Sequence, residues 1–177
     1  MDFLEKDLED IIWNAQSTRE GREKLKSRGL NIQGKVFRQP NLGEYGIPDL
    51  VSIVYKNKAA IITIYELKRD EVNVHTLLQS SKYVKGIRIL LERFNLNWSS
   101  IHVCLIGKRI DINTDFSFLI DMIPHVHVYT YNIDIDGLHF KKKYDFRFSN
   151  HEIFDKITPV FKYSEIKEMR NGTDTDD

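Results

Sequence analysis

The sequence predicts an α/β fold in which a mixed β-sheet is flanked by helices. Apolar, β-branched segments at 51–55 and 59–65 predict two strands, and the Lys-Asn-Lys stretch at 56–58 predicts the hairpin turn between them. Apolar residues at helical spacing over about 74–93 then predict a long amphipathic helix. Further apolar strands follow it along the chain, so helix and strand patterns alternate as they do in an α/β layer.

Each remaining element is predicted by its own pattern. The apolar residues at helical spacing in an N-terminal helix are Leu4, Leu8, Ile11 and Ile12. The predicted core face of the long helix consists of Val74, Leu77, Leu78, Ser81, Val84 and Leu91. A charge-rich stretch at 17–28 predicts an extra helix that ends at Gly29. Other strands are expected at 32–38, 101–106, 126–133 and 138–146, and a short helix is expected at 115–123.

Length and composition indicate one globular domain. The 177 residues are 41% hydrophobic and 29% charged, which is enough for one core and leaves no room for a separate helicase domain. We expect a single domain over residues 1–170, a weaker helical pattern after Asn150, and a disordered acidic tail at 171–177. No apolar run approaches membrane-spanning length, and one cysteine, Cys104, excludes an internal disulfide. We therefore expect a cytoplasmic protein without membrane insertion.

Asp49, Glu66 and Lys68 are the strongest candidates for a functional site. The predicted hairpin places the two acids on adjacent strands. Glu66 and Lys68 are two residues apart on one strand, so their side chains point to the same face and Leu67 points to the other. Two carboxylates and an ammonium group are therefore expected to converge in one small space.

This set of groups suits Mg²⁺ or Mn²⁺, because these hard cations prefer oxygen ligands and keep several waters. Asp49 and Glu66 supply the carboxylates, and the Leu67 carbonyl offers a neutral ligand. A bound metal polarises a phosphate, while Lys68 holds the attacking water or offsets charge that develops on phosphorus. An isolated Glu-x-Lys is most often a solvated strand end, so its weight depends on the elements around it.

Two helices supply further candidates. Gln79 and Tyr83 are four residues apart on the long helix, so one lies above the other beside the apolar stripe. Glu5 and Glu9 flank the apolar face of the N-terminal helix, from which a carboxylate can reach the metal through water. Glu5 is the expected third acid, with Glu9 or Glu44 as the alternatives.

In this order the residues resemble the PD-(D/E)xK nuclease superfamily, which has the restriction-endonuclease-like fold. The matching positions are Glu5 in Glu5-Lys6-Asp7-Leu8, Pro48-Asp49, Glu66-Leu67-Lys68 and Gln79-x-x-x-Tyr83. The likeness is greatest to the RecB-like branch and to the nuclease domain of archaeal-type mismatch and branched-DNA endonucleases. It covers roughly the first half of the chain and implies an αβββαβ core with C-terminal α/β additions.

The resemblance implies a Mg²⁺-dependent deoxyribonuclease, with Mn²⁺ as a substitute. The implied catalytic residues are Glu5, Asp49, Glu66 and Lys68, the metal ligands are Asp49, Glu66 and Leu67, and the DNA-binding residues are Gln79, Tyr83, Lys85 and Arg88. A catalytically silent DNA-binding or scaffold subunit and an RNase with the same site are the alternatives. The choices between endonuclease and exonuclease, and between a homodimer and a larger nucleic-acid-processing complex, stay open.

The formal net charge is zero, so nucleic-acid binding has to rest on local basic patches. The candidates are Lys82, Lys85 and Arg88 on the long helix, 108–109 after a strand, and the lysines at 141–143. His125 and His127 lie two apart on a predicted strand and face the same side. With no companion cysteine or carboxylate at a metal-site spacing, they are interpreted as surface histidines.

Overall fold

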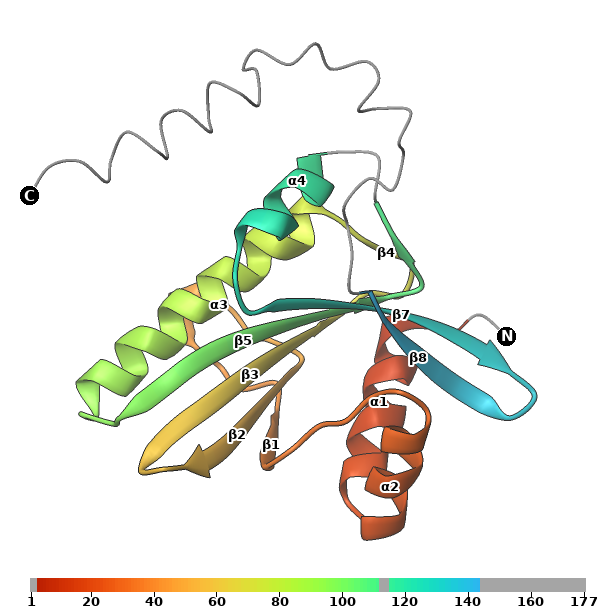
Figure 1. Cartoon of the computed structure of the whole chain (residues 1–177), viewed down its shortest axis with the longest axis horizontal. Coiled ribbons are helices and arrows are strands. Elements are labelled where there is room, and N and C mark those ends of the chain that lie inside the picture. The colour runs from red at the N-terminus through yellow and green to blue at the C-terminus, as the bar shows by residue number, and fades with distance from the viewer. Residues whose placement is uncertain (1–2, 112–114, 144–177) are drawn as a thin grey trace, which may run out of the picture. The chain divides into compact units, whose positions relative to one another are not determined.

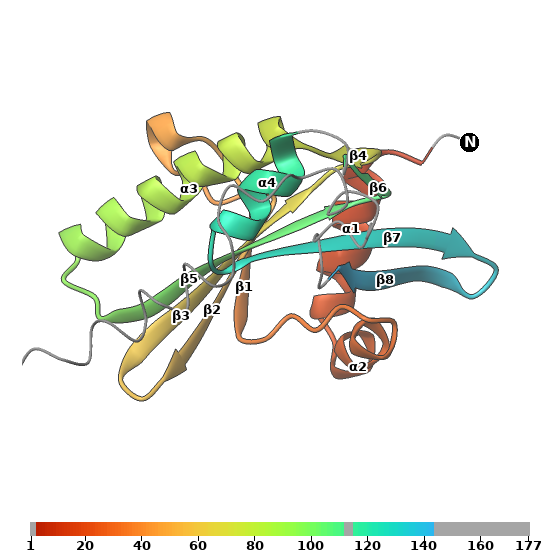
Figure 2. The ribbon, with the colours of Figure 1, turned by 45° about the horizontal axis from the view of Figure 1, so that its top comes forward.

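Six strands form a mixed sheet with helices on both faces (Figures 1 and 2). The computed structural model describes residues 3–111 and 115–143 of the chain, and the fold below is that of these residues. The strand order is β1-β2-β3-β5-β7-β8. The pairs β3/β5 and β5/β7 are parallel, whereas β1/β2, β2/β3 and β7/β8 are antiparallel. The predicted α/β class, with a mixed sheet flanked by helices, is confirmed.

The elements follow the chain in an order close to the expected one. They are α1 Glu5–Gln16, α2 Arg19–Ser27, β1 Lys35–Arg38, the 3-10 helix η1 Gly43–Tyr45, β2 Leu50–Lys56, β3 Ala59–Leu67, β4 Glu71–Val72, α3 Val74–Arg93, β5 Trp98–Gly107, β6 Arg109–Ile110, α4 Asp115–Met122, β7 Val126–Asp134 and β8 Gly137–Lys143. The short parallel pair β4/β6 was not predicted, because two-residue strands leave no periodic signal. The expected end of the last strand at 144–146, the helical pattern after Asn150 and the tail at 171–177 lie outside the described residues.

The hairpin expected from the sequence is formed by β2 and β3. Asn57 and Lys58 at its tip both have positive φ, which is the backbone geometry of a two-residue hairpin turn. Antiparallel pairing runs from Lys56 opposite Ala59 to Leu50 opposite Tyr65. β3 lies between β2 and β5, and its continuous apolar run suits a strand that is covered on both faces.

Two apolar clusters hold the layers together, one on each face of the sheet. On one face α3 and α4 pack on alternate residues of β2, β3 and β5, including Ile62, Ile64 and Leu105. On the other face α1 and α2 pack on the intervening residues, including Leu67 and Ile106. Figure 1 shows these layers, with α3 and α4 above the sheet and α1 and α2 below it. None of the described helices is both long and apolar enough to cross a membrane.

The buried face of α3 differs from the expected one. Leu78 is 54% exposed and Ser81 is also exposed, so neither belongs to the core face. The buried residues of this helix are Thr76, Leu77, Ser80, Tyr83, Gly86, Ile87 and Leu91. Leu77 and Leu91 are buried as expected, and Val74 and Val84 pack partly against the core. The expected pattern left out the small and aromatic residues of the buried stripe.

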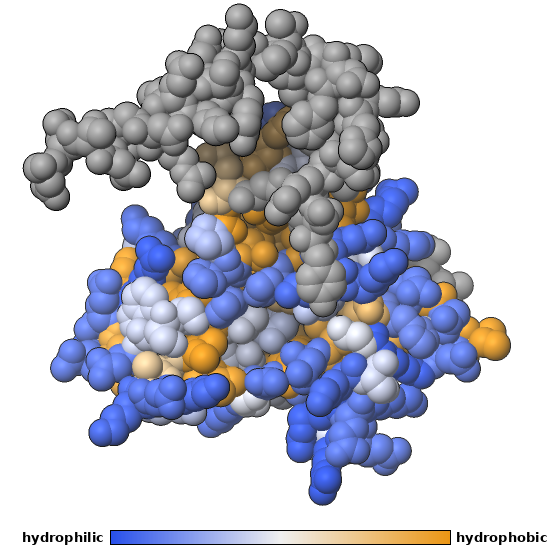
Figure 3. Space-filling model, in the orientation of Figure 1, coloured by the Kyte–Doolittle hydropathy of each residue, from blue (hydrophilic) through white to orange (hydrophobic). Residues whose placement is uncertain are grey.

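α4 also carries exposed apolar side chains, Phe118 and Met122. Figure 3 shows apolar side chains on this side of the molecule.

The loop that leads into β2 is docked on α3 through two glycines. A Cβ on Gly86 would lie 2.7 Å from the Tyr45 Cβ atom, and a Cβ on Gly46 would lie 2.8 Å from Cε1 of Tyr83. Gly46 also has a φ of 97°, which side-chain-bearing residues rarely adopt. Close approach of the loop to the helix therefore requires glycine at both positions, and it fixes the backbone just before Asp49.

We expect Gly86→Ala to lower the free energy of unfolding by about 1–3 kcal/mol, because the added methyl group overpacks the contact with Tyr45. The cost of overpacking therefore has to exceed the roughly 1 kcal/mol by which alanine is favoured over glycine inside a helix. Urea denaturation monitored by circular dichroism measures the difference. Ser81→Ala, an exposed change on the same helix, is the control and is expected to be neutral or slightly stabilising. A Gly86→Ala protein as stable as the wild type would show that the loop does not rest on the helix.

Candidate active site

Strand register brings Asp49 and Glu66 together. Leu50 pairs with Tyr65, so the next step along the hairpin sets Asp49 opposite Glu66. Val51 and Ile64, two residues from each acid, both face the α3 side of the sheet. Because side chains alternate along strands, both carboxylates also face α3. The expected convergence of the two acids is a consequence of the hairpin register.

Hydrogen bonds fix three of the groups in this space. The Leu67 N–H donates to Asp49 Oδ2 at 2.7 Å. The Lys68 ammonium donates to Glu66 Oε1 at 2.7 Å. Glu66 is 2% exposed, and its second oxygen, Oε2, is buried without a hydrogen-bond partner among the described residues. A buried carboxylate oxygen with no donor is costly, so this atom marks a place suited to a cation or a water molecule.

The protonation of the two acids reflects their burial. Burial raises the pKa of Asp49 to about 6, against the opposing effects of the Leu67 N–H and the Lys68 charge. Burial, together with the charge of Asp49, raises the pKa of Glu66 to about 7. Two acids whose negative charges are disfavoured in this way are typical of a functional site more than of a stabilising ion pair.

Lys68 stays protonated beside these acids. Burial lowers its pKa, but the hydrogen bond to Glu66 and the charges of the neighbouring carboxylates outweigh that effect, so the pKa is raised overall. Its side chain is 24% exposed. The ammonium group is therefore a fixed positive charge between the buried carboxylates and the solvent.

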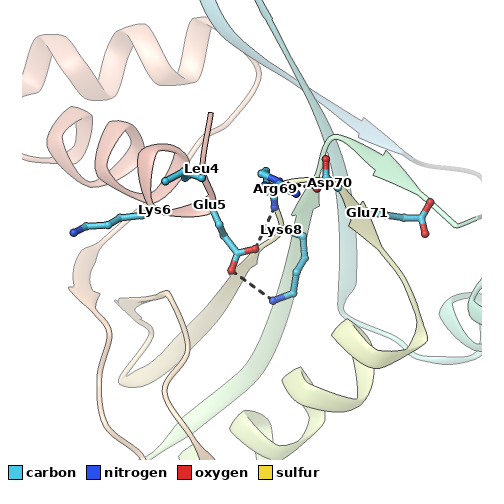
Figure 4. A pocket seen from close by; sticks show the side chains of 7 residues that line it. All are labelled: Leu4, Glu5, Lys6, Lys68, Arg69, Asp70 and Glu71. Atoms are coloured by element: carbon cyan, nitrogen blue, oxygen red, sulfur yellow. Dashed lines mark hydrogen bonds and ion pairs between the residues drawn. The ribbon is translucent and has the colours of Figure 1, made fainter. Parts of the chain in front are cut away.

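Glu5 joins this group from α1. Its Oε1 lies 3.8 Å from the Lys68 ammonium, and its Oε2 accepts a hydrogen bond of 3.2 Å from the Arg69 N–H. Figure 4 shows Glu5 and Lys68 pointing toward each other, whereas Lys6 points away. Both residues line an open cavity of about 520 Å³, whose other lining residues are Leu4, Lys6, Arg69, Asp70 and Glu71. Asp49 and Glu66 are not part of this lining, so Glu5 and Lys68 form the accessible side of the site.

The two alternative third acids lie elsewhere. Glu9 is buried, and its carboxylate is occupied by Arg38 and by Gln39, whose Nε2 lies 3.0 Å from Glu9 Oε2. Glu44 is exposed in η1, where it accepts a hydrogen bond from the Tyr45 hydroxyl. The geometry therefore favours Glu5, and the Glu9–Arg38 ion pair ties α1 to β1.

Gln79 and Tyr83 are joined to each other. The Gln79 Nε2 donates to the Tyr83 hydroxyl at 2.6 Å. Tyr83 is 3% exposed and supports Gly46, whereas Gln79 is exposed. Burial and then the charge of Glu66 raise the pKa of Tyr83, so its hydroxyl stays neutral near the carboxylates. Tyr83 thus belongs to the wall of the site, and Gln79 is the member of the pair that solvent reaches.

The basic residues of α3 point in different directions. At 100° per residue, Lys82 lies about 60° from Gln79 around the helix, whereas Arg88 lies about 180° away. The Arg88 guanidinium instead sits 5.7 Å from the Trp98 ring centroid. Lys82 and Lys85 are exposed. Arg88 therefore lies on the opposite side of α3 from Gln79 and packs near Trp98, whereas Lys82 lies close to Gln79 around the helix.

The donor set fits a hard divalent cation. Two carboxylates converge, and Glu66 Oε2 lacks a hydrogen-bond partner among the described residues. Burial disfavours the charged form of both acids, and the charge of Asp49 adds to this at Glu66. A bound divalent cation would favour both charged forms. Over the described ranges 3–111 and 115–143, no group of three His, Cys, Asp or Glu side chains is arranged to hold a metal ion. Asp49 and Glu66 would thus bind with water completing the shell, which is the usual mode for Mg²⁺. Leu67 was expected to offer its carbonyl to the metal, and the contact that the structure shows between Leu67 and Asp49 is made by the Leu67 N–H.

Comparison with known proteins returned no match to a family model, a curated protein or a solved structure. The arguments for function therefore come from the geometry of the site and from the sequence motifs.

We expect Glu66→Gln to stabilise the metal-free protein at pH 8 by about 1–3 kcal/mol. The pKa of Glu66 is raised on folding, so the native state holds this proton more tightly than the unfolded chain does. Its contribution to stability is present below about pH 4.5 and is lost as pH rises through about 7. Glutamine imitates the protonated acid, so the advantage of the variant should shrink at pH 4.5.

Urea denaturation with a chelator at both pH values tests this expectation. Glu92→Gln, which removes an exposed acid from α3, is the control and should change stability by less than about 0.5 kcal/mol at either pH. A Glu66→Gln protein less stable than the wild type at pH 8 would mean that the Lys68 ion pair dominates and that the carboxylates are structural.

Proposed function

We propose that this protein is a metal-dependent deoxyribonuclease of the restriction-endonuclease-like fold. The observation that carries the proposal is the buried pair of Asp49 and Glu66, with the Lys68 ammonium beside it and a Glu66 oxygen that no described residue hydrogen-bonds. The element order supports it, because α1, the strands β1 to β3, α3 and β5 follow the αβββαβ arrangement that the motif resemblance implies, with α2, η1 and the two-residue β4 inserted.

The residues divide the chemistry between them. Asp49 and Glu66 would hold Mg²⁺, which when bound makes a water molecule more acidic and polarises the scissile phosphate. Lys68 is held by Glu66, so its ammonium group can orient the attacking water and offset charge on the phosphate oxygens. Glu5 reaches Lys68 from the solvent side, where it can accept a hydrogen bond from a water molecule.

Hydrolysis by this set of groups needs no covalent enzyme intermediate. Cys104 is unsuited to form such an intermediate, because burial raises the pKa of its thiol and keeps it unreactive. In this proposal the oxygen of a water molecule attacks phosphorus, and the phosphodiester bond to a 3′ or 5′ oxygen breaks.

Asp49→Asn and Glu66→Gln should each abolish Mg²⁺- or Mn²⁺-dependent cleavage while preserving the fold, since each change keeps the shape and removes the charge. Labelled linear, circular, branched and single-stranded DNA, with RNA in parallel, form the substrate panel. Glu44→Gln is the matched control, because it neutralises the exposed acid five residues before Asp49 and should leave the rate unchanged.

The same panel separates the alternatives. DNA binding without cleavage on any substrate, with either metal, would identify a silent DNA-binding subunit. Cleavage of RNA alone would identify a ribonuclease. Wild-type rates for Asp49→Asn would overturn the site itself.

Lys82→Ala should reduce the slope of log affinity against log salt by about one unit on duplex DNA, because one phosphate contact and its counterion release are lost. Arg88→Ala is the matched control on the opposite side of α3 and should leave the slope unchanged. Binding is measured over a salt series with Ca²⁺ in place of Mg²⁺. An effect of Arg88 with none from Lys82 would place the DNA on the other side of the helix.

A further inference from the structure

Three histidines gather on the sheet face that α1 and α2 cover in part. His102 in β5 and His127 in β7 approach each other, with His102 Nδ1 3.3 Å from His127 Nε2. The ring of His125, just before β7, lies edge-on to His102 with 4.8 Å between centroids. His102 is distant from the other two in the sequence, and the parallel pairing of β5 with β7 brings it next to them.

This cluster lies on the opposite face of the sheet from Glu66. Cys104 and Ile106, which alternate with His102 along β5, pack with the α1 and α2 layer. Glu66 alternates with Ile62 and Ile64, which pack with the α3 layer. Because alternate side chains share a face, the sheet itself separates the imidazoles from the carboxylates.

The two facing ring nitrogens share a hydrogen bond in the metal-free protein, and their spacing is also that of two histidine ligands of one metal ion. Zn²⁺ binds histidine nitrogen at about 2.0–2.1 Å, so two nitrogens at a tetrahedral angle lie roughly 3.3 Å apart. His102 Nε2 lies 2.9 Å from the Ser100 hydroxyl oxygen. When Nδ1 binds a metal, the ring proton sits on Nε2, and Ser100 can accept its hydrogen bond. This arrangement is the usual way in which a second residue fixes a ligating histidine.

Both imidazoles are neutral at pH 7, as metal ligands must be. Burial, with the charge of Lys142, lowers the pKa of His127 to about 4. Burial and the neighbouring His125 lower the pKa of His102 as well. One of the two facing nitrogens carries the proton of their hydrogen bond, so a bound metal ion would replace that proton, and the nearby Lys142 charge opposes a cation.

We propose that His102 and His127 chelate one first-row transition-metal ion, with Zn²⁺ as the cellular candidate. Neutral imidazole nitrogens prefer Zn²⁺, Ni²⁺ and Cu²⁺ to Mg²⁺, so this ion is chemically distinct from the one at the carboxylates. No group of three His, Cys, Asp or Glu ligands is arranged around a metal in the part of the chain that is described, so water completes the coordination. The bound ion links β5 to β7 and stabilises the folded state.

The full-length protein titrated with ZnCl₂ and with NiCl₂ in a calorimeter tests the site, and melting temperature with and without Zn²⁺ gives a second readout. With excess Mg²⁺ present to occupy Asp49 and Glu66, the wild type should bind one Zn²⁺ and melt at a higher temperature with it. His102→Ala and His127→Gln should lose both effects, and Ser100→Ala should weaken binding by about tenfold. Excess Mg²⁺ should not compete.

Two further variants keep the result interpretable. His75→Gln removes an exposed histidine on α3 and should bind Zn²⁺ as the wild type does. Lys142→Met keeps both ligands and removes the opposing charge, so it should bind Zn²⁺ more tightly. Unchanged Zn²⁺ affinity in His102→Ala and His127→Gln, or no Zn²⁺ binding by the wild type, would overturn the proposal. Neither result would bear on cleavage at Asp49 and Glu66.

Discussion

The register of the β2–β3 hairpin is the constraint on which the candidate site depends. It sets Asp49 opposite Glu66 and turns both carboxylates toward α3. A slip of one residue would send the apolar residues of β2 to the wrong face, so core packing holds the register in place. The energy that keeps two acids close together therefore comes from the burial of aliphatic side chains beside them.

The acids themselves work against stability. Their raised pKa values mean that folding disfavours their charged forms, and one oxygen of Glu66 has no described donor. Groups of this kind persist where they serve chemistry and where the surrounding structure over-determines their position. Here the position of Asp49 is held by the loop before it, which packs directly on α3 because Gly46 and Gly86 lack side chains.

The two faces of the sheet carry different donor chemistry. Carboxylate oxygens face α3, and imidazole nitrogens lie on the side of α1 and α2. α1 nevertheless contributes to the carboxylate site, because Glu5 contacts Lys68 and Arg69 just after the end of β3. Hard and borderline cations would thus be sorted by ligand type, with the sheet as the barrier between them.

The sequence by itself determined the hairpin, the limits of α3 and the grouping of Asp49, Glu66 and Lys68, because these depend on local periodicity and on neighbouring strands. It also indicated Glu5, yet only the packing of α1 against the strand end could separate it from Glu9 and Glu44. The buried side of α3 and the meeting of His102 with His127 were decided by tertiary structure. Each of these depends on which residues distant in sequence become neighbours, and a pattern read along one segment does not contain that information.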